Sequence, residues 1–266
     1  MSSRKRARGP MRAPDELREL VETYLRGLAF RRELGGLEEA MRYTLDAGGK
    51  RVRPVLCLAG AEAAGGEIEA ALPAAAALEL VHTFSLVHDD LPALDDDELR
   101  RGLPTAHVRF GEATALLAGD ALLAEAFRLA LSCPGPAVAR ELVEATLDMI
   151  GGQYLDVTNA AEDLAALHRL KTGALFSAAV GCGLWTAGVP DEEQAPWRAF
   201  GEELGLLFQI VDDVLDGDGY VLRVGEAAAR DLAGEAAARV TAKLAAIPAD
   251  TSVLAEIVAD LAARTS

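Results

Sequence analysis

The segment from Leu206 to Leu215 reads Leu-Leu-Phe-Gln-Ile-Val-Asp-Asp-Val-Leu, and Asp216 follows it directly. Asp212 and Asp216 are four residues apart, so an α-helix would project both carboxylates from one face, with Gln209 one turn earlier on that side. The apolar neighbours would draw this helix into the core and remove water from the charges. Because unpaired buried carboxylates are costly, the pattern predicts a bound cation, and Mg²⁺ suits oxygen ligands best. Solvated aspartates at a helix end are the alternative for this segment alone.

A second apolar segment also ends in aspartates. It covers residues 81–90 and reads Val-His-Thr-Phe-Ser-Leu-Val-His-Asp-Asp, and Pro92 ends the expected helix because proline cannot continue the hydrogen-bond ladder. An acidic loop follows over residues 95–98. One acidic loop is usually a solvated surface, but two Asp-Asp pairs that each follow an apolar helix predict a carboxylate cage between facing helices.

The rest of the sequence is typical of helices. Long segments are rich in Ala, Leu, Glu and Arg with apolar residues three and four positions apart, and alternating runs of Val, Ile and Thr are absent. With 266 residues, 51% of them hydrophobic, the chain can bury the core of one domain. We expect an all-α, single-domain antiparallel bundle over residues 15–266 and a flexible basic tail over residues 1–14. The expected helices cover residues 15–33, 37–47, 53–63, 72–90, 112–132, 137–150, 164–187, 191–215, 225–246 and 252–263.

Composition argues against several classes of function. The 42 acidic and 26 basic side chains give a net charge of -16, which would repel a nucleic acid over most of the surface. The three cysteines lie far apart in the sequence, so we expect buried thiols in a reducing cytoplasm. Residues 172–190 carry no charge, but their many small residues favour a buried helix of a soluble protein over stable membrane insertion. No apolar run follows the basic N-terminal residues to form a signal peptide.

The basic residues cluster in a way that indicates an anion site. Only four lysines occur in the chain, and one of them belongs to the segment Gly-Gly-Lys-Arg-Val-Arg-Pro over residues 48–54, where glycines let the backbone approach an anion closely. Lys171 adjoins the hydroxyl of Thr172, and Arg100 and Arg101 adjoin the acidic loop. In such an acidic protein these clusters predict a specific anion site. Any one of them could instead be an ordinary cation at a helix end.

Together, these motifs resemble those of the trans-isoprenyl diphosphate synthases, and most of all the bacterial farnesyl diphosphate synthases, which have the same four-residue gap between Asp90 and Asp95. The resemblance runs in order from about residue 15 to the end. It implies an all-α bundle with a central active-site cavity, usually a homodimer, in which the two aspartate motifs hold three Mg²⁺ ions on an allylic diphosphate. The matching motifs are residues 48–54, residues 89–102, Gly119-Asp120, Gly152-Gln153 with Asp156, Lys171-Thr172, and Gln209 with Asp212, Asp213 and Asp216.

The resemblance also implies a role for each matching residue. The implied metal ligands are Asp89, Asp95, Asp156 and Asp212, with Asp90, Asp213 and Asp216 as further ligands or as residues behind them. The implied allylic diphosphate site is Arg100, Lys171, Thr172 and Gln209. The implied isopentenyl diphosphate site is Gly49, Lys50, Arg53, His82 and Arg101. The residues expected to act in catalysis are Asp89, Asp90, Asp95, Arg100, Lys171, Gln209 and Asp212. The other histidines, His88, His107 and His168, are left as structural or unassigned.

The expected reaction joins isopentenyl diphosphate to dimethylallyl diphosphate and then to geranyl diphosphate. Cations stabilise the departing diphosphate, the double bond of isopentenyl diphosphate attacks the allylic cation, and the diphosphate takes up the released proton. No nucleophile is needed, and a dry apolar tunnel protects the cation from water. Phe84 and Ser85 precede Asp89 by five and four residues and are expected to form the floor of that tunnel, which predicts farnesyl diphosphate as the product.

The segment after Asp216 departs from the family pattern. The family generally has a longer loop with two lysines there, whereas Gly217-Asp218-Gly219-Tyr220 leads almost directly into the next helix and no lysine occurs before Lys243. Arg223 is a candidate substitute. A geranylgeranyl diphosphate synthase and a non-catalytic subunit that binds prenyl diphosphates therefore remain as alternatives. A terpene cyclase shares the fold and the metal chemistry, but it would not need residues 48–54 for a second diphosphate.

Overall fold

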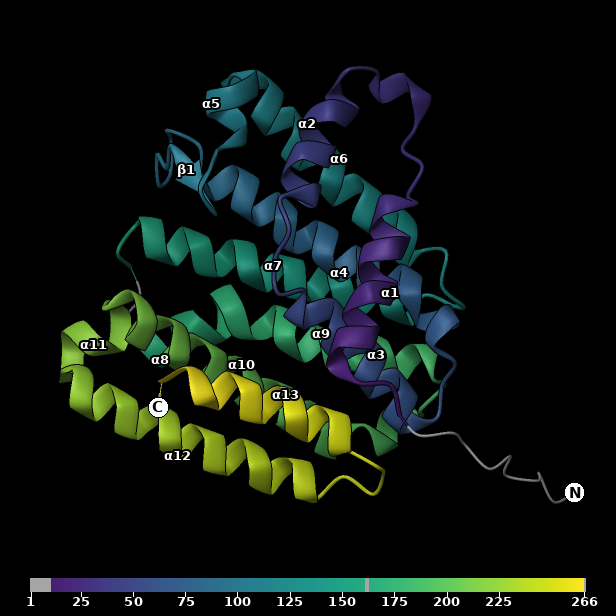
Figure 1. The fold of residues 1–266 in the computed structure, drawn as a ribbon, viewed down its shortest axis with the longest axis vertical. Coiled ribbons are helices and arrows are strands. Elements are labelled where there is room, and N and C mark those ends of the chain that lie inside the picture. Colours follow the sequence, from purple (N-terminus) through teal and green to yellow (C-terminus); the bar gives the residue numbers. More distant parts are fainter. Residues whose placement is uncertain (1–10, 161–162, 266) are drawn as a thin grey trace, which may run out of the picture.

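The computed structural model describes residues 11–160 and 163–265, and it confirms the all-α prediction (Figure 1). Helices account for nearly all of the regular structure, and a two-residue hairpin of β1 (Leu99–Arg100) and β2 (Leu103–Pro104) is the exception within the described residues. The α-helices are α1 (Pro14–Arg26), α2 (Leu37–Asp46), α3 (Val52–Ala64), α4 (Ile68–Asp89), α5 (Ala106–Phe110), α6 (Glu112–Ala130), α7 (Ala137–Val157), α8 (Leu164–His168), α9 (Ala174–Thr186), α10 (Ala195–Asp216), α11 (Gly219–Val224), α12 (Glu226–Ala245) and α13 (Ser252–Ala262).

The centre of the bundle is built from its most apolar helices. α4 packs against α3, α6 and α9, while α9 also contacts α7 and α10. A helix that is apolar on every side belongs in a core, and α3 and α9 are buried almost throughout their length. In Figure 1, α10 to α13 gather at one end of the molecule, and β1, α2 and α5 lie at the other. The end of α4 and the end of α10, which carry the two aspartate motifs, thus belong to different parts of the bundle.

Several predicted helix boundaries are wrong for local reasons. α1 ends at Arg26 and not at residue 33, because the chain turns at Gly27. α7 continues through two glycines to Val157, beyond the predicted end at residue 150, because packing outweighs their low helix propensity. The predicted helix over residues 164–187 is three elements, α8, a π-helical turn (Arg169–Gly173) and α9. Of the predicted basic tail, residues 1–10 lie outside the described residues, and α1 already begins at Pro14.

One helix among the described residues is long and apolar enough to cross a membrane by length and composition, and it is α4. In the bundle, 67% of its most apolar window is buried against other helices. This degree of burial is what a central core helix requires, and the apolar content of α4 is accounted for by packing. The uncharged stretch predicted to be a buried helix is indeed the core helix α9.

A buried ion-pair network fixes the segment before α3. The backbone of Arg51 is left-handed, with φ of 46°, and its guanidinium donates to Glu22 Oε1 at 2.7 Å, Glu79 Oε1 at 2.5 Å and the carbonyl of Leu45 at 2.6 Å. Burial alone would lower the pKa of Arg51, but the two carboxylates raise it above its ordinary value. Arg51 therefore holds together α1, α2, α4 and the basic segment, with its charge fully compensated.

α3 and α9 approach so closely that one glycine is required. A Cβ atom at Gly183 would lie 2.4 Å from the carbonyl oxygen of Cys57, which is backbone and cannot rotate away. We predict that Gly183→Ala lowers the free energy of unfolding by about 1–3 kcal/mol. Gly60→Ala is the matched control, because a Cβ there meets nothing within 4 Å, and it should raise stability by about 0.5–1 kcal/mol. Urea denaturation measures both, and equal effects would contradict the close contact.

Candidate active site

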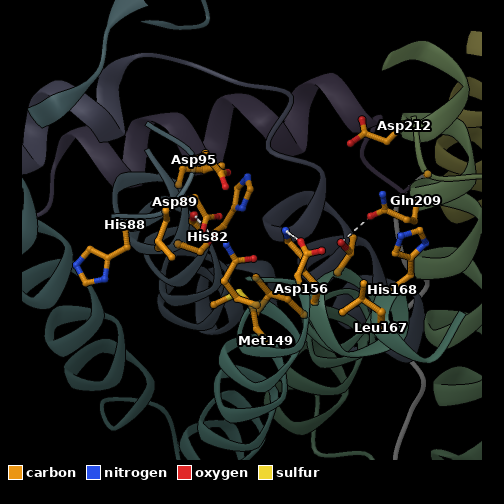
Figure 2. Close-up of a pocket in the computed structure, with 18 of the residues that line it drawn as sticks. His82, His88, Asp89, Asp95, Met149, Asp156, Leu167, His168, Gln209 and Asp212 are labelled. Carbon is orange, nitrogen blue, oxygen red and sulfur yellow. Dashed lines mark hydrogen bonds and ion pairs between the residues drawn. The ribbon is translucent and has the colours of Figure 1, made fainter. Parts of the chain in front are cut away.

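A cavity of about 1140 Å³ lies between the two aspartate motifs. Its walls come from α4, the loop after it, α7, the π-helical turn and α10. Its lining combines carboxylates and cations with apolar side chains, among them Phe84, Met149 and Leu175. Figure 2 shows Asp89 and Asp95 on one side of this cavity and Asp212 with Gln209 on the other, with Asp156 between them.

The first acidic wall is formed where α4 ends. The amide of Asp95 donates to the carbonyl of Asp89 at 2.9 Å, so the loop turns back and brings the second carboxylate beside the first. Burial raises the pKa of Asp89 to about 6, Lys171 opposes this rise, and the negative charge of Asp95 adds to it. The wall therefore carries more negative charge than its protein neighbours neutralise, which favours a bound cation.

Asp90 has a different position from Asp89. Its carboxylate is buried and accepts from Arg100 Nε at 2.6 Å and Nη2 at 2.5 Å, and it does not line the cavity. Arg100 reaches Asp97 Oδ2 as well, at 3.1 Å, and lines the cavity with the rest of its side chain. Of the two roles predicted for Asp90, this geometry favours the supporting one, in which Asp90 orients the arginine of the predicted diphosphate site.

The second acidic wall is the last turn of α10. Asp212 and Asp216 line the cavity from one helix face, as their spacing predicts, but both residues are exposed and not buried as the apolar neighbours suggested. Partial loss of water raises the pKa of Asp212, and the charges of Asp216 and Asp213 raise it further. Asp213 is the buried member and accepts from Gln209 Nε2 at 2.7 Å and from the amide of Tyr220 at 2.8 Å. Those bonds favour a supporting role for Asp213.

The π-helical turn contributes a cation beside the carboxylates. Lys171 Nζ forms an ion pair with Asp156 Oδ2 at 2.5 Å, drawn as a dashed line in Figure 2. Thr172 Oγ1 donates to Gln209 Oε1 at 2.7 Å, which joins this turn to α10. The four predicted allylic-site residues, Arg100, Lys171, Thr172 and Gln209, all line the main cavity.

The carboxylates fit Mg²⁺ by their chemistry. No group of three or more His, Cys, Asp or Glu side chains is close enough to hold a metal ion by itself within residues 11–160 and 163–265. Mg²⁺ needs no such cage, because it takes one or two carboxylates and completes its shell with water and phosphate oxygens. Asp89, Asp95, Asp156, Asp212 and Asp216 all line one cavity, so each wall can offer carboxylate oxygens to ions held on a shared diphosphate.

A smaller basic cavity of about 400 Å³ adjoins the first and shares four of its residues. It brings together all five residues predicted to bind isopentenyl diphosphate, which are Gly49, Lys50, Arg53, His82 and Arg101. The guanidinium of Arg101 donates to the carbonyl of Gly48 and lies against Gly49. The structure thus groups these residues, while their role in binding stays a prediction.

Burial lowers the pKa values of two side chains of the basic cavity, Arg53 and His82. Arg53 stacks on the rings of Phe176 and Phe208, at 4.6 and 5.7 Å from their centroids, and burial lowers its pKa to about 10, so it remains a cation at neutral pH. Burial and the surrounding arginines hold the pKa of His82 well below its ordinary value. His82 is therefore neutral at pH 7 and can offer a hydrogen bond without adding charge.

A short helix replaces the longer family loop after Asp216. α11 begins at Gly219, where φ is 44° and a Cβ would lie 2.1 Å from Asp213 Oδ2. The ring of Tyr220 then packs edge to face on His168, with centroids 5.4 Å apart. Asp213 thus anchors this short helix at the cavity, where Asp218 and Gly219 form part of the wall.

Sequence reasoning gave no role to two polar residues of the cavity wall. Both amide atoms of Gln153 are buried without a hydrogen-bond partner among the described residues, and so is Nδ1 of His168. Both residues line the main cavity. The Gly152-Gln153 motif signals the first, whereas His168 occurs in no recognised motif and is found only through its contact with Tyr220.

Comparison with known proteins agrees with this site. The model of the polyprenyl synthetase family matches residues 35–265. A geranylgeranyl diphosphate synthase of Cyanophora paradoxa is 41% identical over 232 residues, which cover 82% of this chain and 77% of that protein. The farnesyl diphosphate synthase of Bacillus subtilis (strain 168) is 41% identical over 210 residues, which cover 73% and 71%. Several chloroplastic relatives are longer, and the chain spans 57% to 63% of their length.

A solved structure shares the architecture as well as the sequence. The geranyltransferase of Legionella pneumophila superposes with a TM-score of 0.84 and 31% sequence identity, over 95% of this chain and 96% of that one. The family match covers both aspartate motifs and the whole cavity wall. The chain therefore belongs to the polyprenyl synthetase family, the trans-isoprenyl diphosphate synthases.

Proposed function

We propose that this protein is a Mg²⁺-dependent prenyltransferase that condenses isopentenyl diphosphate with dimethylallyl and geranyl diphosphate to give farnesyl diphosphate. The observation that carries the proposal is the lining of one cavity, which combines two carboxylate walls, cations and apolar side chains, together with the basic pocket beside it. These features suit an allylic diphosphate held through metal ions, a hydrocarbon chain, and a second diphosphate in the basic pocket.

Ionisation of the allylic diphosphate is the demanding step, because negative charge builds on the leaving group. When bound, Mg²⁺ supplies positive charge that stabilises this group. Arg100 and Lys171 add fixed cations, and Asp90 and Asp156 hold them in place through the ion pairs at 2.5 Å. The carboxamide of Gln209, oriented by Thr172 and Asp213, supports the same site.

The second substrate needs a separate anion site beside the reacting carbon. Lys50, Arg53 and Arg101 supply cations in the basic pocket, and neutral His82 supplies a hydrogen bond without competing charge. Arg53 and His82 line both cavities. Isopentenyl diphosphate with its diphosphate group in the basic pocket could therefore present its double bond to the main cavity. The proton released after attack can pass to the departed diphosphate, so no other base is required.

Product length follows from the apolar end of the main cavity. The buried Phe84 ring lies more than one helical turn before Asp89 on the same helix, and Ser85, whose hydroxyl donates to the carbonyl of His82, lies beside it. A ring there would stop the chain at fifteen carbons. The geranylgeranyl diphosphate synthases among the relatives support the second candidate, a twenty-carbon product.

Catalysis by the purified chain tests the central claim. Incubation with isopentenyl and geranyl diphosphate should give turnover with Mg²⁺ and none with excess EDTA. Asp212→Asn should lower kcat about 10²–10³-fold, because a ligand of the leaving-group cations is lost. Asp96→Asn is the control, since Asp96 lies in the exposed loop outside the cavity wall and should keep wild-type kcat.

The same preparation distinguishes the remaining alternatives. Turnover without added partner contradicts a non-catalytic subunit, whereas activity that persists in EDTA contradicts the proposed metal dependence. The exposed Leu116, Leu117, Leu147 and Ile150 on α6 and α7 support a homodimer. Light scattering should then give twice the chain mass of 27.9 kDa.

The two lysines are expected to serve different substrates. Lys50→Gln should raise the KM for isopentenyl diphosphate about 10- to 100-fold and leave the KM for geranyl diphosphate near the wild-type value, because one charged hydrogen bond is lost. Lys171→Gln should instead lower kcat. Lys243→Gln, on the exposed face of α12, is the control. Steady-state kinetics with each substrate varied in turn measures all three, and identical effects of the first two variants would contradict separate sites.

Removal of the Phe84 ring tests product length. Phe84→Ala should extend the main product from fifteen to twenty carbons, because the growing chain can pass the position of the ring. Mass spectrometry of the hydrolysed products measures the change. A wild-type product of twenty carbons would favour the second candidate, and an unchanged fifteen-carbon product in the variant would show that another residue forms the floor.

A further inference from the structure

The floor of the cavity contains a second ring beside Phe84. His88 lies one turn later on α4, and its imidazole packs edge to face on the phenyl ring, with centroids 4.9 Å apart and planes at 73°. Both side chains line the main cavity. Figure 2 shows His88 directed away from Asp89 and Asp95, so its ring does not belong to the carboxylate wall.

The imidazole of His88 is fixed against α6. Its Nε2 lies 3.0 Å from the carbonyl oxygen of Leu116, so this nitrogen carries the proton and donates to the backbone. Asp120 Oδ1 lies 3.8 Å from the same nitrogen. A side chain on one helix is therefore attached to the backbone of the helix that packs against it.

A gap in the surface of α6 makes this position possible. Gly119 lies under the imidazole, and a Cβ atom there would lie 2.3 Å from both Cδ2 and Nε2 of His88. No side chain other than hydrogen leaves room for the ring. The reaction described above does not use the Gly119-Asp120 motif. Gly119 of this motif instead makes room for the ring of His88.

We infer that His88 is a positioning residue for product length, which keeps the Phe84 ring across the end of the cavity while the hydrocarbon chain grows against it. Movement of the phenyl ring toward the imidazole requires the imidazole to move, and the imidazole would then have to leave the Leu116 carbonyl and the space above Gly119. The contacts of His88 with the backbone of α6 therefore help to keep the Phe84 ring in place when a longer hydrocarbon chain reaches it. This inference rests on the proposed function, and it adds His88 and Gly119 to the residues that determine product length.

The first test is a double-mutant cycle on the two rings. Wild type, His88→Ala, Phe84→Ala and the double variant are each incubated with isopentenyl diphosphate, geranyl diphosphate and Mg²⁺, and the products are identified by mass. His88→Ala should raise the ratio of twenty- to fifteen-carbon product roughly fivefold, in line with one lost hydrogen bond and ring contact. Because His88 acts through Phe84, the double variant should match Phe84→Ala alone.

Gly119 provides an independent test with a matched control. Gly119→Ala should displace the imidazole and raise the same product ratio, but it should have no further effect in the His88→Ala background, where no ring meets the new methyl group. Gly151→Ala is the control, since a Cβ at this helical glycine meets nothing within 4 Å, and it should keep the wild-type ratio. Circular dichroism and the melting temperature confirm that each variant is folded.

Two results would overturn the inference. One is a folded His88→Ala variant with the wild-type product ratio. The other is a double variant whose products are longer than those of Phe84→Ala, because His88 would then be a barrier by itself. A wild-type enzyme without prenyl product would refute the proposed function instead.

Discussion

The main cavity brings several carboxylates together, and their loss of water and mutual repulsion cost free energy. Asp89, Asp95, Asp156, Asp212 and Asp216 line the same space, and the raised pKa values of Asp89 and Asp212 reflect partial loss of water and mutual repulsion. Within residues 11–160 and 163–265, only Asp156 of these five has a protein cation as an ion-pair partner. The remaining charge favours divalent cations, and in the proposed function these cations would hold the diphosphate in a protein with a net charge of -16.

Several cations near this charge are held by carboxylates outside the wall of the main cavity. Asp90 holds Arg100, and Glu22 and Glu79 hold Arg51 next to the basic segment. Arg51 and Arg101 both have a positive φ, at 46° and 55°, a strained backbone that costs of order 1–3 kcal/mol per residue and persists only where the surroundings enforce it. Buried polar contacts thus hold the cations of the proposed anion sites in place.

One helix links chemistry to product size. α4 carries Phe84, His88 and Asp89, so the separation between floor and metal wall is fixed by helix geometry at roughly 7.5 Å for five residues. The neighbouring helix α6 offers backbone and empty space to the side chain of His88. In the proposed function, product length would depend on helix packing as well as on the ring at position 84.

The sequence by itself determined the helical class, the core helices and the two acidic walls, because these follow from local periodicity: residues four apart share a helix face whatever the rest of the fold does. Its motifs also predicted residues that the structure brings together around the two cavities. Only the tertiary structure decided that Asp90 accepts a hydrogen bond from Arg100 and that Asp213 accepts one from the amide of Tyr220. The same holds for the continuation of α7 through its glycines to Val157 and for the position of the His88 ring above Gly119. Each of these depends on contacts between elements and on competition among nearby partners, and neither helical spacing nor composition encodes which partner prevails.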